Sequence, residues 1–343
     1  MAKTVRLCDI AKIAGVSSVS VSKALSGKDG VSDELRERII KISEQLGYKS
    51  VSSKVVPWGK TGNIGVLIAE QFIQQDNSFY WEMYQDVVTA LSEKGCLSIL
   101  ELVTPEMEKN LEMPKTIVER KIDGMIIIGT LNKEYNKFVW HDGRVPIMFI
   151  DAYEAHMDYD AVISDGYYGM YTMTNYLIAH GHKDIGFVGN ILATSSITDR
   201  YLGFCKAMME AGLEVRDEWV IPDRDNVAML NIDELPEKLP TAFAANCDNS
   251  AYELINRLKE KGIRCPEDIS IVGFDNYINV DSNPEITTYS VSMKKMAKVG
   301  VRNLIRKVIH REYNKGLQLV TGQLIVKGSV NHRSLKDPAF FDN

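Results

Sequence analysis

Three segments near the start of the chain carry apolar residues at intervals of three or four, the spacing of an amphipathic helix. The segments cover residues 7–14, 18–25 and 33–46, and their expected core positions are Ile10, Ile13, Ala14, Val21, Ala24, Leu25, Leu35, Ile39, Ile42 and Leu46. Gly15 ends the first helix, and Ser17 is a suitable N-cap for the second. Two helices joined by a short turn containing Gly, with a third helix closing the core, predict a helix-turn-helix head over residues 1–49.

From residue 63 onward, short apolar runs alternate with longer amphipathic segments. We expect strands over residues 64–68, 97–102, 124–128, 147–150, 161–164, 185–188, 242–245 and 270–273, and helices over residues 80–94, 167–179, 200–211, 250–261 and 293–309. Strands that alternate with helices predict parallel sheets. Residues 63–162 and 163–289 each hold a set of alternating strands and helices, so the pattern predicts an α/β body of two doubly wound lobes. Ligands bind such sheets beyond the carboxyl ends of the strands.

The segment between these two regions, SVSSKVVPWGKTG over residues 50–62, is polar and contains Pro and Gly. Such a composition is typical of a linker.

The net charge of −6 is unevenly distributed along the chain. Residues 1–60 hold 11 Lys and Arg against 6 Asp and Glu, a net of +5, while the remaining residues hold 29 against 40, a net of −11. A basic head on an acidic body is expected where the head alone meets a polyanion such as DNA. The alternative is that short segments differ by a few charges in any protein.

In a helix-turn-helix, the second helix enters the major groove and its amino-terminal part reaches the bases. The outward-facing residues of this helix and its cap are Ser17, Ser18, Val19, Ser20, Ser22 and Lys23. Short hydroxyls contact phosphates or bases, a Val contacts a thymine methyl, and a Lys reaches guanine or phosphate. The alternative is a three-helix bundle with a solvated, serine-rich helix.

The motifs of most enzymes and metal proteins are missing from the sequence. No GxGxxG follows the first expected strand, and the chain has neither a GxxxxGK[ST] loop nor a GxSxG elbow. The five cysteines are scattered without a CxxC pair, and His180 and His182 have no further ligand close by in the sequence. We therefore expect no cofactor, no metal and no catalytic residue, and so no enzyme.

The sequence holds no apolar run near the ~20 residues of a membrane helix and no signal-peptide pattern at its start. We expect a cytoplasmic protein without a membrane partner.

The run DIAKIAGVSSVSVSKALSGKDGVSDELRERIIKISEQLGYK resembles the DNA-binding head of the LacI/GalR family of bacterial repressors. The resemblance implies that Ser18, Val19 and Lys23 occupy operator-reading positions. It also implies a hinge helix that wedges a Leu into the minor groove. The linker departs from that pattern, because Pro57, with Val55 beside it, stands where the Leu is expected and would break a helix.

The body resembles the sensor domain of the same family, which is similar to periplasmic sugar-binding proteins. Segments such as TGNIGVLI, KIDGMIIIG, TDRYLGFCKAM and PEDISIVGFDN follow in the family order. The resemblance implies a periplasmic-binding-protein-like body, with lobes of residues 63–162 plus 292–321 and 163–291 plus 322–343. It places at the effector cleft Asp151, Arg200, Asn246, Asp248 and Asp275. Arg200 would clamp the effector and Asp275 would accept its hydrogen bonds, unless the two only pair with each other.

Two departures from the family pattern affect this cleft. The segment AEQFIQQDNSFY is about four residues longer than in the family and brings Glu70 and Phe79, with Gln71 and Phe72, to the expected pocket mouth. Arg224 stands where the family has a stacking aromatic residue. The ligand could therefore be sugar-like or, with Arg200 and Arg224 as counter-charges, phosphorylated or otherwise negatively charged.

The sequence thus predicts a homodimeric repressor that binds double-stranded operator DNA and a small, carbohydrate-like effector. Two alternatives stay open: a DNA-binding regulator that has lost ligand sensing, and a stand-alone small-molecule binding protein.

Overall fold

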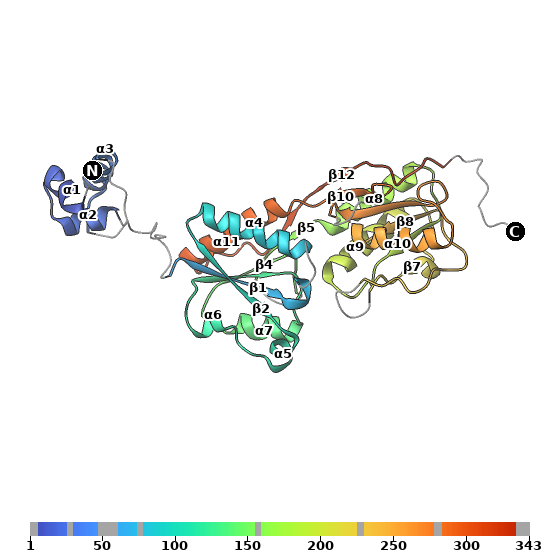
Figure 1. The fold of residues 1–343 in the computed structure, drawn as a ribbon, viewed down its shortest axis with the longest axis horizontal. Helices are drawn as coiled ribbons and strands as arrows, with labels where there is room; N and C mark the ends of the chain where they lie inside the picture. Colours follow the sequence, from blue (N-terminus) through green and yellow to red (C-terminus); the bar gives the residue numbers. More distant parts are fainter. Residues whose placement is uncertain are drawn as a thin grey trace.

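A computed structural model describes residues 6–25, 30–46, 61–73, 78–154, 159–224, 230–277 and 283–333. It contains a bundle of three helices at one end and a body of two α/β lobes (Figure 1). The hinge positions Val55 and Pro57 lie outside the described residues.

The head consists of α1 (Leu7–Ala14), α2 (Ser18–Leu25) and α3 (Asp33–Gln45), which confirms the three predicted helices. Its buried core is formed by Ile10, Ala11, Ala14, Val21, Ala24, Ile39 and Ile42. Ile13 is 54% exposed, so its prediction as a core residue is wrong. The buried stripe of α1 runs through Ala11 instead, whose small side chain allows α2 to pack closely, and Ile13 lies on the flank.

Local hydrogen bonds fix the turn between α1 and α2. Gly15 has a φ of 70° and its N–H donates to the carbonyl of Ala11, which ends α1. The hydroxyl of Ser17 accepts the N–H of Ser20 at 3.0 Å, as an N-cap does. The guanidinium of Arg36 on α3 donates to the carbonyl of Ala24 on α2 at 3.2 Å, which ties α3 to α2.

The first lobe is built on a six-stranded sheet in the order β11-β5-β4-β3-β1-β2, and all neighbouring strands are parallel. Its strands are β1 (Asn63–Ala69), β2 (Leu97–Val103), β3 (Gly124–Ile128), β4 (Ile147–Ile150), β5 (Asp160–Ser164) and β11 (Leu317–Val320). One face carries α4 (Phe79–Glu93) and α11 (Met293–Ile309), and the other carries α5 (Pro105–Asn110), α6 (Lys115–Val118) and α7 (Lys133–His141) (Figure 1).

Alternation along β1 explains why this lobe has a core on each face of its sheet. Val66 and Ile68 pack with the apolar residues of α4 and α11, whereas Leu67 between them packs with those of α6 and α7. Burial on both faces is the reason that strands of parallel sheets are continuously apolar.

The second lobe has a sheet in the order β12-β10-β9-β8-β6-β7, in which only β12 is antiparallel to its neighbour. Its strands are β6 (Ile185–Val188), β7 (Val220–Ile221), β8 (Ala242–Ala245), β9 (Ser270–Asp275), β10 (Thr287–Ser290) and β12 (Gln323–Ile325). The helices α8 (Gly166–Ala179) and α9 (Ser195–Glu210) pack on one face, and α10 (Asp248–Glu260) packs on the other. Two 3-10 turns, η1 (Glu70–Phe72) and η2 (Asp217–Trp219), follow β1 and precede β7.

The chain passes between the lobes three times: from β5 to α8, from β10 to α11, and from β11 to β12. Ile163 and Ser164 belong to β5 of the first sheet, although the sequence analysis assigned them to the second lobe. β7, β10, β11 and β12 were not predicted, because β7 has only two residues and the other three mix polar with apolar residues.

Candidate functional site

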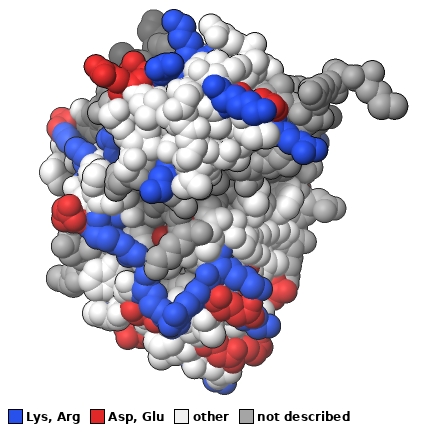
Figure 2. Space-filling view, turned by 90° about the vertical axis from the view of Figure 1, so that its left-hand side faces the viewer, with Lys and Arg blue, Asp and Glu red and all other residues white. Residues whose placement is uncertain are grey.

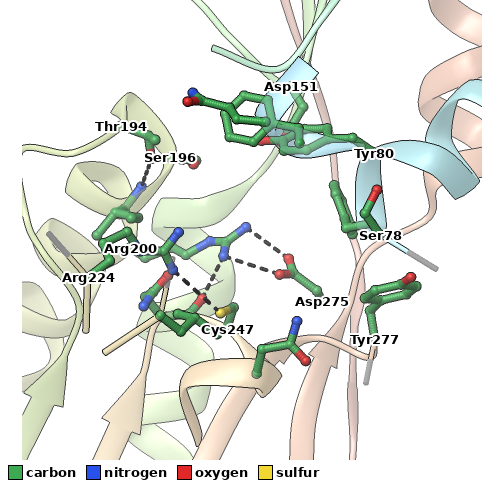
Figure 3. Close-up of a pocket in the computed structure, with 17 residues that line it drawn as sticks. Ser78, Tyr80, Asp151, Thr194, Ser196, Arg200, Arg224, Cys247, Asp275 and Tyr277 are labelled. Atoms are coloured by element: carbon green, nitrogen blue, oxygen red, sulfur yellow. Dashed lines mark hydrogen bonds and ion pairs between the residues drawn. The ribbon is translucent and has the colours of Figure 1, made fainter. Parts of the chain in front are cut away.

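A cavity of about 300 Å³ lies between the two lobes, where the carboxyl ends of the parallel strands meet (Figure 3). This volume is at the lower end of the range of small-molecule sites. The lining residues come from both lobes and include Gln71, Phe72, Ser78, Phe79, Tyr80, Asp151, Thr194, Ser196, Ile197, Arg200, Arg224, Leu230, Asn246, Cys247, Asn249, Asp275 and Tyr277.

Six of the eight residues proposed for effector binding line this cavity: Phe79, Asp151, Arg200, Arg224, Asn246 and Asp275. Glu70 does not line it, and its neighbours Gln71 and Phe72 do. Asp248 does not line it either, because its carboxylate turns toward β9 and accepts the N–H of Tyr277 at 2.8 Å. Its other oxygen lies so close to Gly273 that a Cβ on that glycine would be 2.0 Å away. Asp248 therefore shapes the loop after β9.

Arg200 on α9 and Asp275 at the end of β9 form a buried ion pair, with 2.9 Å between Nη2 and Oδ1. Nη1 of Arg200 also donates to the carbonyl of Asn246 at 2.6 Å, and the guanidinium lies 4.0 Å from the centre of the Phe274 ring. Arg200 and Asp275 therefore pair with each other, as the alternative raised from the sequence has it. Nε of Arg200 is buried and has no hydrogen-bond partner among the described residues.

Arg224 is paired as well, through a residue that sequence analysis missed. Asp223, which is fully buried, accepts Nε of Arg224 at 3.0 Å and Nη2 at 2.7 Å. The same carboxylate accepts Nδ2 of Asn246 at 2.6 Å and the N–H of Asn190 at 2.9 Å. Despite its burial, Asp223 has a pKa below its ordinary value, because Arg224 and these donors stabilise the charged form. Both guanidinium groups of the cavity thus already have a carboxylate.

Asp151 follows β4 in the left-handed region, with a φ of 61°, and is 6% exposed. Its Oδ2 accepts the hydroxyl of Tyr80 at 3.2 Å. Burial raises the pKa of Asp151 from 3.8 to about 7, and nearby Arg200 opposes that rise only in part. Asp275, with a φ of 96°, likewise ends a strand of the opposite lobe in the left-handed region. Strained backbone at both strand ends aims the two carboxylates into one cavity.

Aromatic rings form one wall of the cavity, and the sequence indicated Phe72 and Phe79 but not Tyr80 or Tyr277. The rings of Phe72 and Tyr80 are 4.7 Å apart, and Phe79 meets Tyr80 edge-on at 5.4 Å. Phe79 of the first lobe also meets Tyr277 of the second at 5.7 Å. Tyr277 could have been found by the rule that selected the other strand-end residues, since it follows β9 by two positions.

The lobes are in contact on two sides of the cavity. Besides the contact of Phe79 with Tyr277, the hydroxyl of Tyr153 in the first lobe donates to Asp199 on α9 at 2.9 Å. Side chains from both lobes therefore meet beside the cavity.

In the head, α2 presents one exposed face. Ser17, Ser18, Val19, Ser22 and Lys23 are exposed, and Val19 is 65% exposed. An exposed Val between hydroxyl-bearing residues is typical of a surface that meets thymine methyls and phosphates. Ser20 is half-buried and its hydroxyl is hydrogen-bonded to that of Ser17, so these two serines also have a structural role at the helix start.

Comparison with known families accounts for both parts of the chain. Residues 6–50 match the bacterial regulatory proteins of the lacI family, and residues 174–330 match the periplasmic binding protein-like domain. The chain belongs to the LacI family. It is a DNA-binding transcriptional repressor of that family, with the predicted helix-turn-helix head.

Relatives of this LacI-family chain span its whole length. The HTH-type transcriptional repressor PurR of Vibrio campbellii is 26% identical over 329 residues, which cover 94% of this chain and 97% of that protein. Among solved structures, the transcriptional regulator CelR–cellobiose complex superposes with a TM-score of 0.68 at 20% identity, over 95% of this chain and 99% of that one. The lac repressor dimer bound to operator and the anti-inducer ONPF superposes with a TM-score of 0.65 at 20% identity, over 96% of this chain and 100% of that one. At these identities, the two structures bear on the fold alone.

Two further observations concern the described residues of this LacI-family chain. They contain no group of three His, Cys, Asp or Glu side chains placed to hold a metal ion. None of their helices combines the length and the apolar character that crossing a membrane requires.

Proposed function

We propose that this repressor acts in the cytoplasm as a homodimer, and that a small molecule bound between its lobes controls its affinity for operator DNA. The observation that carries the proposal is a cavity between the lobes, lined by buried, oriented polar groups, on the same chain as a DNA-binding head. In that arrangement, an effector can bias the position of the lobes, and with it the spacing of two heads.

For DNA binding, we propose that Ser18, Val19, Ser22 and Lys23 read the major groove and that Ser17 and Ser20 order the start of α2. In the view of the end that carries the head, Lys and Arg side chains form a run across the lower half of the surface, next to clusters of Asp and Glu (Figure 2). Exposed basic groups favour association with the phosphate backbone. A role for Val55 and Pro57 at the minor groove stays a proposal from the sequence.

A dimer is proposed because one small head buries too little surface for operator-scale specificity, and two heads related by symmetry read two half-sites. The lac repressor, whose fold this chain shares, was solved as a dimer bound to operator.

For the effector, the pairing of both arginines argues against the phosphorylated or otherwise anionic ligand considered from the sequence. Arg200 is neutralised by Asp275 and Arg224 by Asp223, so no uncompensated positive charge lines the described cavity. Hydrogen-bonding side chains such as Ser78, Thr194 and Asn249 instead suit a ligand with hydroxyl or N–H groups. We propose a small polar ligand that carries no net negative charge.

The experiment that tests DNA binding begins with selection of genomic fragments on the full-length protein. The recovered duplex is then measured by fluorescence anisotropy with the wild type, Lys23→Ala and Lys259→Ala. Lys259 is exposed on α10 of the second lobe, so its variant makes the same charge change far from the head. Lys23→Ala should weaken binding about tenfold, the usual effect of removing a base or phosphate contact, and Lys259→Ala should leave it unchanged. Equal affinities of all three proteins, or recovery of no preferred sequence, would count against the proposal.

A further inference from the structure

The charges that line the cavity do not balance. Two guanidinium groups, Arg200 and Arg224, line the cavity together with two carboxylates, Asp151 and Asp275. A third carboxylate, Asp223, is fully buried and bonded to Arg224. Each arginine is bonded to one carboxylate at 2.7–2.9 Å, and these pairs account for Asp275 and Asp223. Asp151 forms no ion pair with any described residue. The cavity therefore holds one surplus carboxylate.

The geometry of Asp151 leaves part of this carboxylate available to a ligand. One oxygen, Oδ2, accepts the Tyr80 hydroxyl, and the side chain lines the cavity. The titratable groups that face it are the neutral hydroxyl of Tyr80 on α4, the guanidinium of Arg200 on α9 and the carboxyl of Asp275 at the end of β9. Arg200 is engaged by Asp275, so nothing nearby fully compensates the Asp151 charge. A buried carboxylate without a cation keeps its proton more readily, and its pKa is accordingly raised to about 7.

Aromatic rings gather on the same side of the cavity as Asp151. Tyr80 bonds directly to Asp151, Phe72 packs on Tyr80, and Phe79 meets Tyr80 edge-on. Figure 3 shows Asp151 and Tyr80 across the cavity from Arg224 and Cys247. A carboxylate among aromatic faces is the combination that binds an ammonium group, through an ion pair and through cation–π attraction.

From this arrangement we propose that the effector carries a positively charged nitrogen group, which binds between Asp151 and the rings of Phe72, Phe79 and Tyr80. The inference rests on the proposed function, in that the cavity is taken as the effector site, and it adds the chemical class of the ligand. A neutral polyol would leave Asp151 without a counter-ion, so that it could only keep its proton, and an anion would oppose its ionisation.

The test uses the full-length protein and two pairs of probes that match in shape and differ in charge. D-glucosamine is compared with D-glucose, and choline with 3,3-dimethyl-1-butanol, by thermal shift and by titration calorimetry at pH 6.5. The cationic member of at least one pair should bind about 30-fold more tightly than its neutral match, the effect expected for one buried charge pair. At tenfold excess over its Kd, it should raise Tm by about 3 °C.

Two variants decide whether Asp151 is the cause. Asp151→Asn keeps the shape, and Asn tolerates the left-handed backbone at this position. It should reduce the preference for the cation to about threefold or less. Asp217→Asn, an exposed position in η2, should keep the full preference. Calorimetry in two buffers should also show proton release when the cation binds the wild type, and none with Asp151→Asn, because the ammonium replaces the carboxyl proton.

The proposal is overturned if the neutral members bind as well as the cationic ones, if Asp151→Asn keeps the preference, or if no cationic probe binds at millimolar concentration. These readouts need no DNA. If the wild-type protein binds no operator DNA, the proposed function is refuted. If it binds DNA but prefers the neutral probes to the cationic ones, only the proposed ligand class is refuted.

Discussion

Replacing either cavity aspartate by asparagine should change stability in opposite directions. Asp151 and Asp275 both end a strand, both have positive φ and both line the cavity, so Asp151→Asn and Asp275→Asn are matched in size and place. They differ in partner, because Asp275 faces Arg200 at 2.9 Å and Asp151 faces only a tyrosine hydroxyl.

The magnitude for Asp151 follows from its pKa, which rises from 3.8 to about 7 in the folded protein. Because the folded pKa is raised, this group costs nothing below about pH 4. Its cost grows as the pH rises through 7 and is constant above that. At about 1.4 kcal/mol per pKa unit, the cost at pH 8 is up to about 4 kcal/mol. This is an upper limit, since the carboxylate faces a cavity rather than a packed core. Asp151→Asn removes that cost.

For Asp275→Asn the expected sign is the reverse. The variant leaves the buried Arg200 guanidinium without its carboxylate, and breaking such a pair costs about 3–5 kcal/mol. Melting of both variants and of the wild type, followed by circular dichroism at pH 5, 6.5 and 8, measures the difference. Asp151→Asn should melt above the wild type at pH 8 and by a smaller margin at pH 5, because the cost vanishes only near pH 4, while Asp275→Asn melts below the wild type throughout. Destabilisation of the same size by both variants at pH 8 would refute the charge balance described for the cavity.

Three further outcomes are expected. Ser17→Ala removes the N-cap of α2 at a cost of about 1 kcal/mol, so amides of α2 should exchange hydrogen about fivefold faster while those of the second lobe are unchanged. Gly203→Ala places a Cβ 2.1 Å from the carbonyl of Tyr167, which forces α8 and α9 apart, and a melting temperature equal to the wild type would contradict that packing. Tyr153→Phe removes the hydrogen bond to Asp199 between the lobes, so small-angle scattering should detect a larger radius of gyration without ligand; an unchanged radius would show that this bond does not hold the lobes together.

Long, strongly patterned elements could be predicted from the sequence. The helices of the head and most strands of both sheets fall within a few residues of their expected positions, because their alternation or helical spacing extends over several turns or residue pairs. Of the edge strands, β2 was predicted, whereas β7, β11 and β12 were not. β7 has two residues, and the partner that makes β11 a strand, β5, lies more than 150 positions earlier in the chain.

Position at the end of a strand predicted some residues of the cavity and not others. This position correctly predicted Asp151 and Asp275, because the carboxyl ends of parallel strands lie at the same edge of a sheet whatever side chains they carry. The prediction for Asp248 was wrong, because position in the sequence does not reveal that its side chain turns away from the cavity toward the backbone of Tyr277. Asp223 was missed, since it follows the short strand β7 and shows its role only through its contact with Arg224. Charge compensation between residues distant in sequence is a property of the packed structure.

Neither lobe is a continuous stretch of chain, and this matters while the protein is being synthesised. The first sheet acquires its edge strand β11 and its covering helix α11 only from residues 293–320, after nearly the whole second lobe has left the ribosome. Until then, the apolar face that α11 covers, including Met148 and Ile150, has no partner from that helix. The head, in contrast, completes its core within the first 46 residues. A nascent chain therefore carries a complete DNA-binding head long before its two lobes can bind an effector. If synthesis ends early, the product has a DNA-binding head without the domain that would regulate it.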